Sequence, residues 1–256
     1  MNTTKKSDSY DWHVDLLRFT GFPMPDFQIE HPNWWKDVVE EPSETRLIQS
    51  RRGLFQDKGP YKEGELLLKI EPFRIDWLYR SIQSPEEQSK KSSLGLFHEA
   101  ISIFTTLTNK WFAMKDFPPL QRIAFGAIIY QPVASHEEGY KKLSKYLNAS
   151  VKLDPEGSSD FLYQINRPRD SNTDIANLKI NRLTKWLVRR NRLIGFAFDD
   201  EHRDIYKGQE TFACSLEIDI NTFPESNKRF SATECQIVFD ELIQLALEIS
   251  QKGDIK

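Results

Sequence analysis

The C-terminal segment from Ala232 to Gln251 has the pattern that most restricts the fold of this chain. Apolar residues recur in it at intervals of three and four, as they do along one face of an α-helix: Cys235, Val238, Phe239, Leu242, Leu245, Ala246 and Ile249. Ser231 and Glu234 match a capping box at its start, and Gly253 supplies a stop. Because so wide an apolar face must be covered, we expect this helix to dock across a sheet.

Two further helices are predicted, at Leu94–Ala113 and Glu137–Leu147. Both have apolar residues at helical spacing, and a serine stands before each of them. Ser92 or Ser93 can cap the first helix, and Ser135 begins a capping box for the second.

Strands are predicted in the segments between these helices. They are Leu66–Trp77, Arg122–Val133, Phe161–Arg167, Ile180–Leu193 and Phe212–Ile220. Arg122–Val133 is apolar on both faces, which is typical of a central strand. Pro72 removes one ladder donor, so Leu66–Trp77 should bend there or lie at an edge. A shorter strand at Leu47–Phe55 should pair with Leu66–Trp77 as a hairpin.

The order of these elements predicts the fold class. Strands follow one another through polar loops without a regular βαβ alternation. We therefore expect an α+β fold with a mainly antiparallel sheet and about three amphipathic helices packed on it. Residues 1–256 should form a single domain, with a possible subdivision near 149–159.

Composition narrows the class of protein further. Hydrophobic residues make up 39% of the chain and aromatic residues 12%, enough for a globular core. The apolar stretches are too short to cross a bilayer, and the first residues lack the apolar core of a secretory signal. Cys214, in a predicted strand, and Cys235, in a predicted helix, are expected to be buried thiols and not a disulfide framework. We expect a soluble, cytoplasmic protein with no membrane association.

A basic stretch is the first candidate binding site. Between Phe161 and Arg192 there are eight Lys and Arg against two Asp, although the whole chain has a net charge of -3. In Ile180–Leu193 the even positions place four candidate residues on one face: Arg182, Trp186, Arg190 and Arg192. The odd positions carry Leu183, Leu187 and Leu193, which we expect to face the core.

Arginine beside an exposed tryptophan can bind phosphates and stack a base, so this face could take an anionic, nucleic-acid-like ligand. Arg167 and Arg169 join the candidate set. The alternative is that these arginines pair with acidic residues of the chain.

Two groups of carboxylates are candidates for chemistry. Glu217 and Asp219 lie two residues apart on a predicted strand, so both should point from the same face and could hold Mg²⁺. Asp199–Asp204 offers further oxygens, and a solvated acidic loop is the alternative. The sequence has no Gly-rich phosphate loop, Gly-x-Ser-x-Gly or His-Glu-x-x-His motif, so we expect no cofactor.

Three pieces of the second half, from Gln121 onward, resemble a sporadically distributed bacterial family without an assigned activity. The pieces are Arg122–Gly126, Leu216–Ile220 and Phe239–Ile249, and Tyr163–Arg167 loosely resembles the family's middle motif. The resemblance implies no activity. The sporadic distribution implies an accessory or defence-associated role that depends on a partner.

These observations favour a non-enzymatic binding or adaptor protein. We expect it to act through a protein partner, with an anionic ligand on the basic stretch as a further candidate. The alternative is a metal-dependent, nuclease-like nucleic-acid enzyme that uses a carboxylate cluster.

Overall fold

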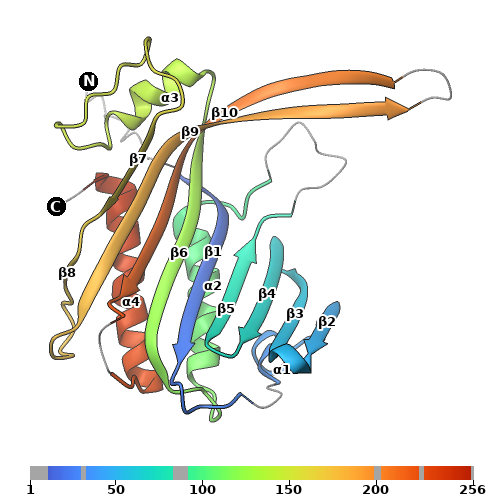
Figure 1. Ribbon diagram of the computed structural model, residues 1–256, viewed down its shortest axis with the longest axis vertical. Coiled ribbons are helices and arrows are strands. Elements are labelled where there is room, and N and C mark those ends of the chain that lie inside the picture. Colours follow the sequence, from blue (N-terminus) through green and yellow to red (C-terminus); the bar gives the residue numbers. More distant parts are fainter. Residues whose placement is uncertain (1–10, 30–32, 83–91, 199–202, 225–227, 255–256) are drawn as a thin grey trace, which may run out of the picture.

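The computed structural model describes residues 11–29, 33–82, 92–198, 203–224 and 228–254, with the backbone alone for 192–198 and 203–209. All strands of the described part belong to one antiparallel sheet, in the order β2–β3–β4–β5–β1–β6–β10–β9–β7, with β8 paired to β9 (Figure 1). The strands are β1 His13–Pro23, β2 Thr45–Gln49, β3 Leu54–Tyr61, β4 Gly64–Glu71, β5 Arg74–Arg80, β6 Leu120–Val133, β7 Leu162–Asn166, β8 Arg169–Asp170, β9 Lys179–Phe198 and β10 Arg203–Thr222. The expected α+β class is confirmed.

The helices of the described residues are α1 Trp34–Val39, α2 Phe97–Phe112, α3 His136–Leu143 and α4 Ala232–Lys252. Helices α2 and α4 lie side by side along one face of the central strands, and α3 packs at the end of β6 and against the middle of β9 and β10 (Figure 1). The opposite face of the central strands has no helix on it in this part of the chain.

Helix α4 forms as its sequence predicts. Ser231 and Glu234 make both hydrogen bonds of the capping box, and the helix ends at Gly253. Its apolar face is buried against the sheet, where the ring of Phe239 contacts Phe19 of β1 and Phe125 of β6. This contact brings α4 onto the middle of the sheet.

Strand β1 lies at the centre of the sheet between β5 and β6, and the sequence did not predict it. A β-bulge between Val14 and Leu16 shifts its register against β6. Because a bulge moves the following side chains to the other face, the apolar residues of β1 do not alternate along its whole length.

The boundaries of the N-terminal strands also differ from prediction. The segment Leu66–Trp77 is two strands, β4 and β5, joined by a tight turn at Pro72 and Phe73. The expected single strand Leu47–Phe55 is wrong, because a 3₁₀ turn at Ser50–Arg52 separates β2 from β3. The expected hairpin is formed by β3 and β4, in which Phe55 lies opposite Ile70.

The serine cap expected for the helix Leu94–Ala113 is also wrong. The N-cap of α2 is Leu96, whose side chain makes no capping hydrogen bond.

The adjacent Trp34 and Trp35 begin the short helix α1 and are buried in the core. The ring of Trp34 meets that of Trp111 from α2 at a centroid distance of 5.4 Å. These tryptophans therefore close the core beneath the N-terminal strands.

Strands β9 and β10 extend beyond the sheet as a two-stranded ribbon (Figure 1). Strand β10 pairs with β6 only from Phe212 onward, whereas its pairing with β9 continues out to Arg203 opposite Phe198. Both strands are thus longer than their periodicity predicted.

No helix of the described residues is long and apolar enough to span a membrane. Cys214 on β10 and Cys235 on α4 are free, buried thiols, as predicted. Burial raises the pKa of Cys214 to about 12 and also raises the pKa of Cys235. Burial therefore favours the protonated thiol at both positions and keeps it away from solvent.

Truncation of Leu242 tests the docking of α4. Leu242 is fully buried, and we expect Leu242→Ala to lower the free energy of unfolding by about 2–5 kcal/mol, because the methyl groups are lost and a cavity remains. Urea unfolding followed by circular dichroism measures the change. The matched control is Ile237→Ala on the same helix, where the side chain is 48% exposed and the loss should be much smaller. Equal losses at both positions would contradict this packing.

Candidate binding face of the sheet

The predicted face assignment of β9 is wrong. Trp186 is completely buried, where its ring stacks on that of Tyr146 at 5.5 Å and its indole N–H donates to Thr184 Oγ1 at 3.1 Å. Arg182 is also buried, whereas Leu183 and Leu187 lie on the opposite, open face. Trp186 is therefore a core residue and not an exposed stacking platform.

Two further arginines of the basic stretch, Arg169 and Arg190, are paired with carboxylates of the chain. Arg190 donates two hydrogen bonds to Glu210, at 2.9 and 2.7 Å, which raise the pKa of the guanidinium. Arg169 donates to Glu241 of α4 at 3.2 Å. The backbone of Arg192 pairs with that of Glu210, and its side chain lies outside the described residues, as does most of the cluster Asp199–Asp204.

Arg167 binds Asp254, which follows the C-terminal end of α4, to the sheet edge, and Arg182 in turn binds the backbone of Arg167. Arg167 holds both oxygens of the Asp254 carboxylate, at 2.5 and 2.7 Å, and Tyr163 donates to the same carboxylate at 2.8 Å. The Nε of Arg182 donates to the carbonyl of Arg167 at 2.7 Å, and burial lowers the pKa of Arg182. The structure thus brings three predicted site residues, Arg167, Arg169 and Arg182, together around α4.

The Arg167–Asp254 pair should contribute to stability in a pH-dependent way. The hydrogen bonds from Arg167 lower the pKa of Asp254 below its ordinary value, so the stabilisation is present above the unfolded pKa of about 3.9. It should be lost as the pH falls through the lower, folded-state pKa. We expect Asp254→Asn to cost about 1–3 kcal/mol at neutral pH, because the partly exposed guanidinium of Arg167 loses its charged hydrogen-bond partner.

Urea unfolding of the wild-type protein and of Asp254→Asn between pH 7 and pH 2 measures the difference in their free energies of unfolding, which should shrink in the acid range. The control is Lys252→Ala, which removes an exposed ion pair with Glu248 on the same helix and should cost less than about 1 kcal/mol. A difference that stays constant with pH would contradict the assignment.

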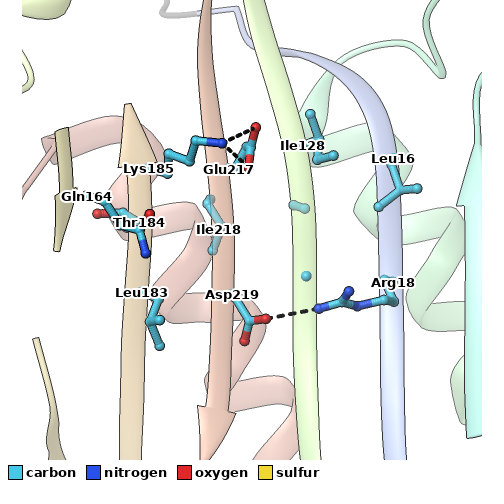
Figure 2. A pocket seen from close by; sticks show the side chains of 12 residues that line it. Leu16, Arg18, Ile128, Gln164, Leu183, Thr184, Lys185, Glu217, Ile218 and Asp219 are labelled. Carbon is cyan, nitrogen blue, oxygen red and sulfur yellow. Dashed lines mark hydrogen bonds and ion pairs between the residues drawn. The ribbon is translucent and has the colours of Figure 1, made fainter. Parts of the chain in front are cut away.

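The open face of the central strands carries the second set of predicted residues. Glu217 and Asp219 of β10 both point from this face, as their spacing predicted, and the covering helices lie behind the sheet (Figure 2). Strand pairing aligns side chains into rows across the face. One row is Leu16, Ile128, Glu217, Lys185 and Gln164, and the next is Arg18, Gly126, Asp219, Leu183 and Asn166.

The ion pair between Arg18 and Asp219 crosses the intervening strand β6, at an Nη2–Oδ2 distance of 3.0 Å. The strands β1 and β10, which carry these two residues, are separated by two sheet spacings, about 10 Å. The crossing is possible because the residue between them is Gly126, where an added Cβ would lie 3.1 Å from the guanidinium. Because strand β1 was not predicted, the sequence analysis missed Arg18 as a residue of this face. The sequence signal that could have found it is the position of Arg18 between the apolar Leu17 and Phe19.

Hydrogen bonds extend this polar arrangement along β10 and β9. Asp219 Oδ1 accepts from Asn221 at 2.7 Å, and Asn221 Oδ1 accepts from Arg122 at 2.7 Å. The Glu217 carboxylate accepts from Lys185 at 3.3 Å and from Arg189 at 3.0 Å. Both predicted carboxylates are therefore bound by cations of other strands: Glu217 by Lys185 and Arg189 of β9, and Asp219 by Arg18 of β1.

A hollow of about 390 Å³ lies between the two rows, above Gly126. Its apolar lining includes Leu16, Ile128 and Leu183 (Figure 2). Its charged lining consists of Arg18 and Lys185 against Glu217 and Asp219, so the hollow is electrically balanced. An apolar floor with paired charges at its rim can bury an apolar group and orient it by hydrogen bonds.

Within the described residues, no group of three or more His, Cys, Asp or Glu side chains is arranged to hold a metal ion. Comparison with known proteins finds no family model that matches this chain and no similar curated protein.

Proposed function

We propose that this chain is a non-enzymatic binding protein that takes a protein partner on the open face of β1, β6, β10 and β9. The observation that carries the proposal is the hollow above Gly126, which lies at the middle of that face and combines apolar walls with balanced charge. We place its action in the bacterial cytoplasm, in an accessory or defence-associated role.

The chemistry of the face supports a protein partner. An antiparallel sheet with one solvated face ordinarily presents polar side chains there. On this face Leu16, Leu78, Ile128, Leu183 and Leu187 are only partly buried. Partly exposed aliphatic side chains between paired charges resemble the composition of a protein interface, with an apolar centre and a polar rim.

The pairing of the arginines with carboxylates argues against a polyanion as the main ligand. Nucleic acid binds through cations that neutralise phosphates and release counterions. Arg167, Arg169 and Arg190 are already paired with carboxylates, and the hollow is balanced. An anionic ligand would have to break these pairs, which makes it the weaker of the two binding proposals.

The partner is first identified with a photoreactive residue at position 128, which would cross-link it in the cells that make this chain. Its binding is then measured by calorimetry with both proteins purified, and a charge placed in the hollow tests the proposal. We expect Leu183→Arg to weaken binding by about tenfold or more, since truncating or blocking a central anchor pocket has effects of this size. The matched control is Ile237→Arg, an exposed position on α4, away from the open face.

Equal binding by wild-type protein and Leu183→Arg would contradict the proposal. So would cross-links from position 128 that contain nucleic acid and no protein. Circular dichroism of each variant shows that it is folded, so that a loss of binding is not a loss of structure.

The alternative, a metal-dependent nucleic-acid enzyme using Glu217 and Asp219, has its own test. A metal would have to displace Lys185 from Glu217 and Arg18 from Asp219. We expect Mn²⁺ to leave the melting temperature unchanged, because only a ligand that binds the native state stabilises it. Thermal unfolding with and without Mn²⁺ measures this. An upward shift that disappears in the double variant Glu217→Gln, Asp219→Asn would favour the enzyme.

A further inference from the structure

The outer edge of β2 is one end of the sheet, and no strand of the described residues pairs with it (Figure 1). An uncovered edge exposes a row of backbone N–H and C=O groups that can pair with another strand. Edge strands are usually protected by proline, by bulges, by short length or by charged side chains, lysine above all. The strand β2, Thr45–Gln49, has no proline, lysine or bulge, its one charged residue is Arg46, and its pairing with β3 is regular over all five residues.

Two large aliphatic side chains of β2 are exposed on its two faces. Leu47 is 39% and Ile48 is 48% exposed. Beside them lies a hollow of about 80 Å³ whose lining includes Phe55 and Ile70. The one charged residue of β2, Arg46, is held by Asp57 of β3 through hydrogen bonds of 2.7 and 3.0 Å. The edge thus combines backbone groups that no strand of the described residues pairs with, exposed apolar side chains, and an arginine whose charge is balanced by Asp57.

We propose that β2 pairs with β2 of a second copy of this chain, so that two sheets join edge to edge around a two-fold axis. The pairing is antiparallel, as between all the neighbouring strands of this sheet, and places Leu47 opposite Leu47 of the second copy. This surface is distinct from the open face of the central strands, and the proposal does not depend on that face binding a partner.

The sequence of β2 fits a copy of itself. A two-fold axis perpendicular to the sheet makes the same surface serve both partners. With the axis at Leu47, all five residues of each strand are paired, Thr45 lies opposite Gln49, and Arg46 lies opposite Ile48. No like charges face each other in this register, and the aliphatic stem of Arg46 can pack on the exposed Ile48. A shift that centred Arg46 would instead place two guanidinium groups face to face.

The mass of the full chain in solution tests the pairing. Light scattering across a concentration series should show a species of twice the 30.0 kDa mass of the chain. Leu47→Lys should shift the protein to monomer, raising the dissociation constant by about tenfold or more, because two ammonium groups would lie opposite each other. The control is Phe73→Lys, in the turn between β4 and β5 and 69% exposed, which should remain dimeric. Wild-type protein that stays monomeric throughout the series would overturn the proposal.

A cross-link identifies the strand and the register. The native cysteines are buried, so Leu47→Cys supplies an accessible thiol. Directly opposed residues in an antiparallel pair have Cα atoms about 4.5–5.5 Å apart, within the range of a disulfide. Mild oxidation of Leu47→Cys should therefore yield covalent dimer. Leu162→Cys, on the other edge strand β7 and 53% exposed, should not. Equal yields at the two positions, or a higher yield from Ile48→Cys than from Leu47→Cys, would overturn the proposal as stated.

Discussion

The ring of Phe239 lies where α4 crosses the middle of the sheet, and the arrangement of the molecule depends on this contact. Its centroid is 5.1 Å from that of Phe19 on β1, 5.9 Å from Phe125 on β6 and 5.8 Å from Phe112 on α2. Four elements far apart in the sequence thus bury one aromatic cluster. Because α2 and α4 share one face of the central strands, the other face of those strands is left to the polar rows and to the hollow above Gly126.

The predictable parts of the fold are those whose apolar pattern has a single period. Helix α4 repeats at three and four residues with a capping box, and β6 is apolar on both faces from Ile123 to Tyr130, so both were placed correctly. Strand β1 was not predicted because its bulge after Val14 interrupts the alternation of apolar and polar residues. Helix α1 has six residues, too few for a helical period to be visible, and its formation depends on burial of Trp34 and Trp35.

The candidate site was predictable only in part, for a related reason. The common face of Glu217 and Asp219 follows from the two-residue repeat of a strand, which needs no tertiary information. Strand β9 has apolar residues on both of its faces: Ile180 and Trp186 on one face, and Leu183 and Leu187 on the other. Its sequence therefore does not indicate which face is covered. The ion pair that spans Gly126 required the position of β1, which only the assembled sheet provides.

The burial of the two thiols has a practical consequence. The Sγ of Cys214 is enclosed beneath α3, 3.2 Å from the carbonyl of Gly139, and Cys235 lies in the first turn of α4. An alkylating reagent can reach Cys214 only when α3 moves off the end of the sheet, and Cys235 only when α4 lifts away from it. The rate at which each thiol is modified therefore measures the opening of one particular layer of the native protein, without any added probe.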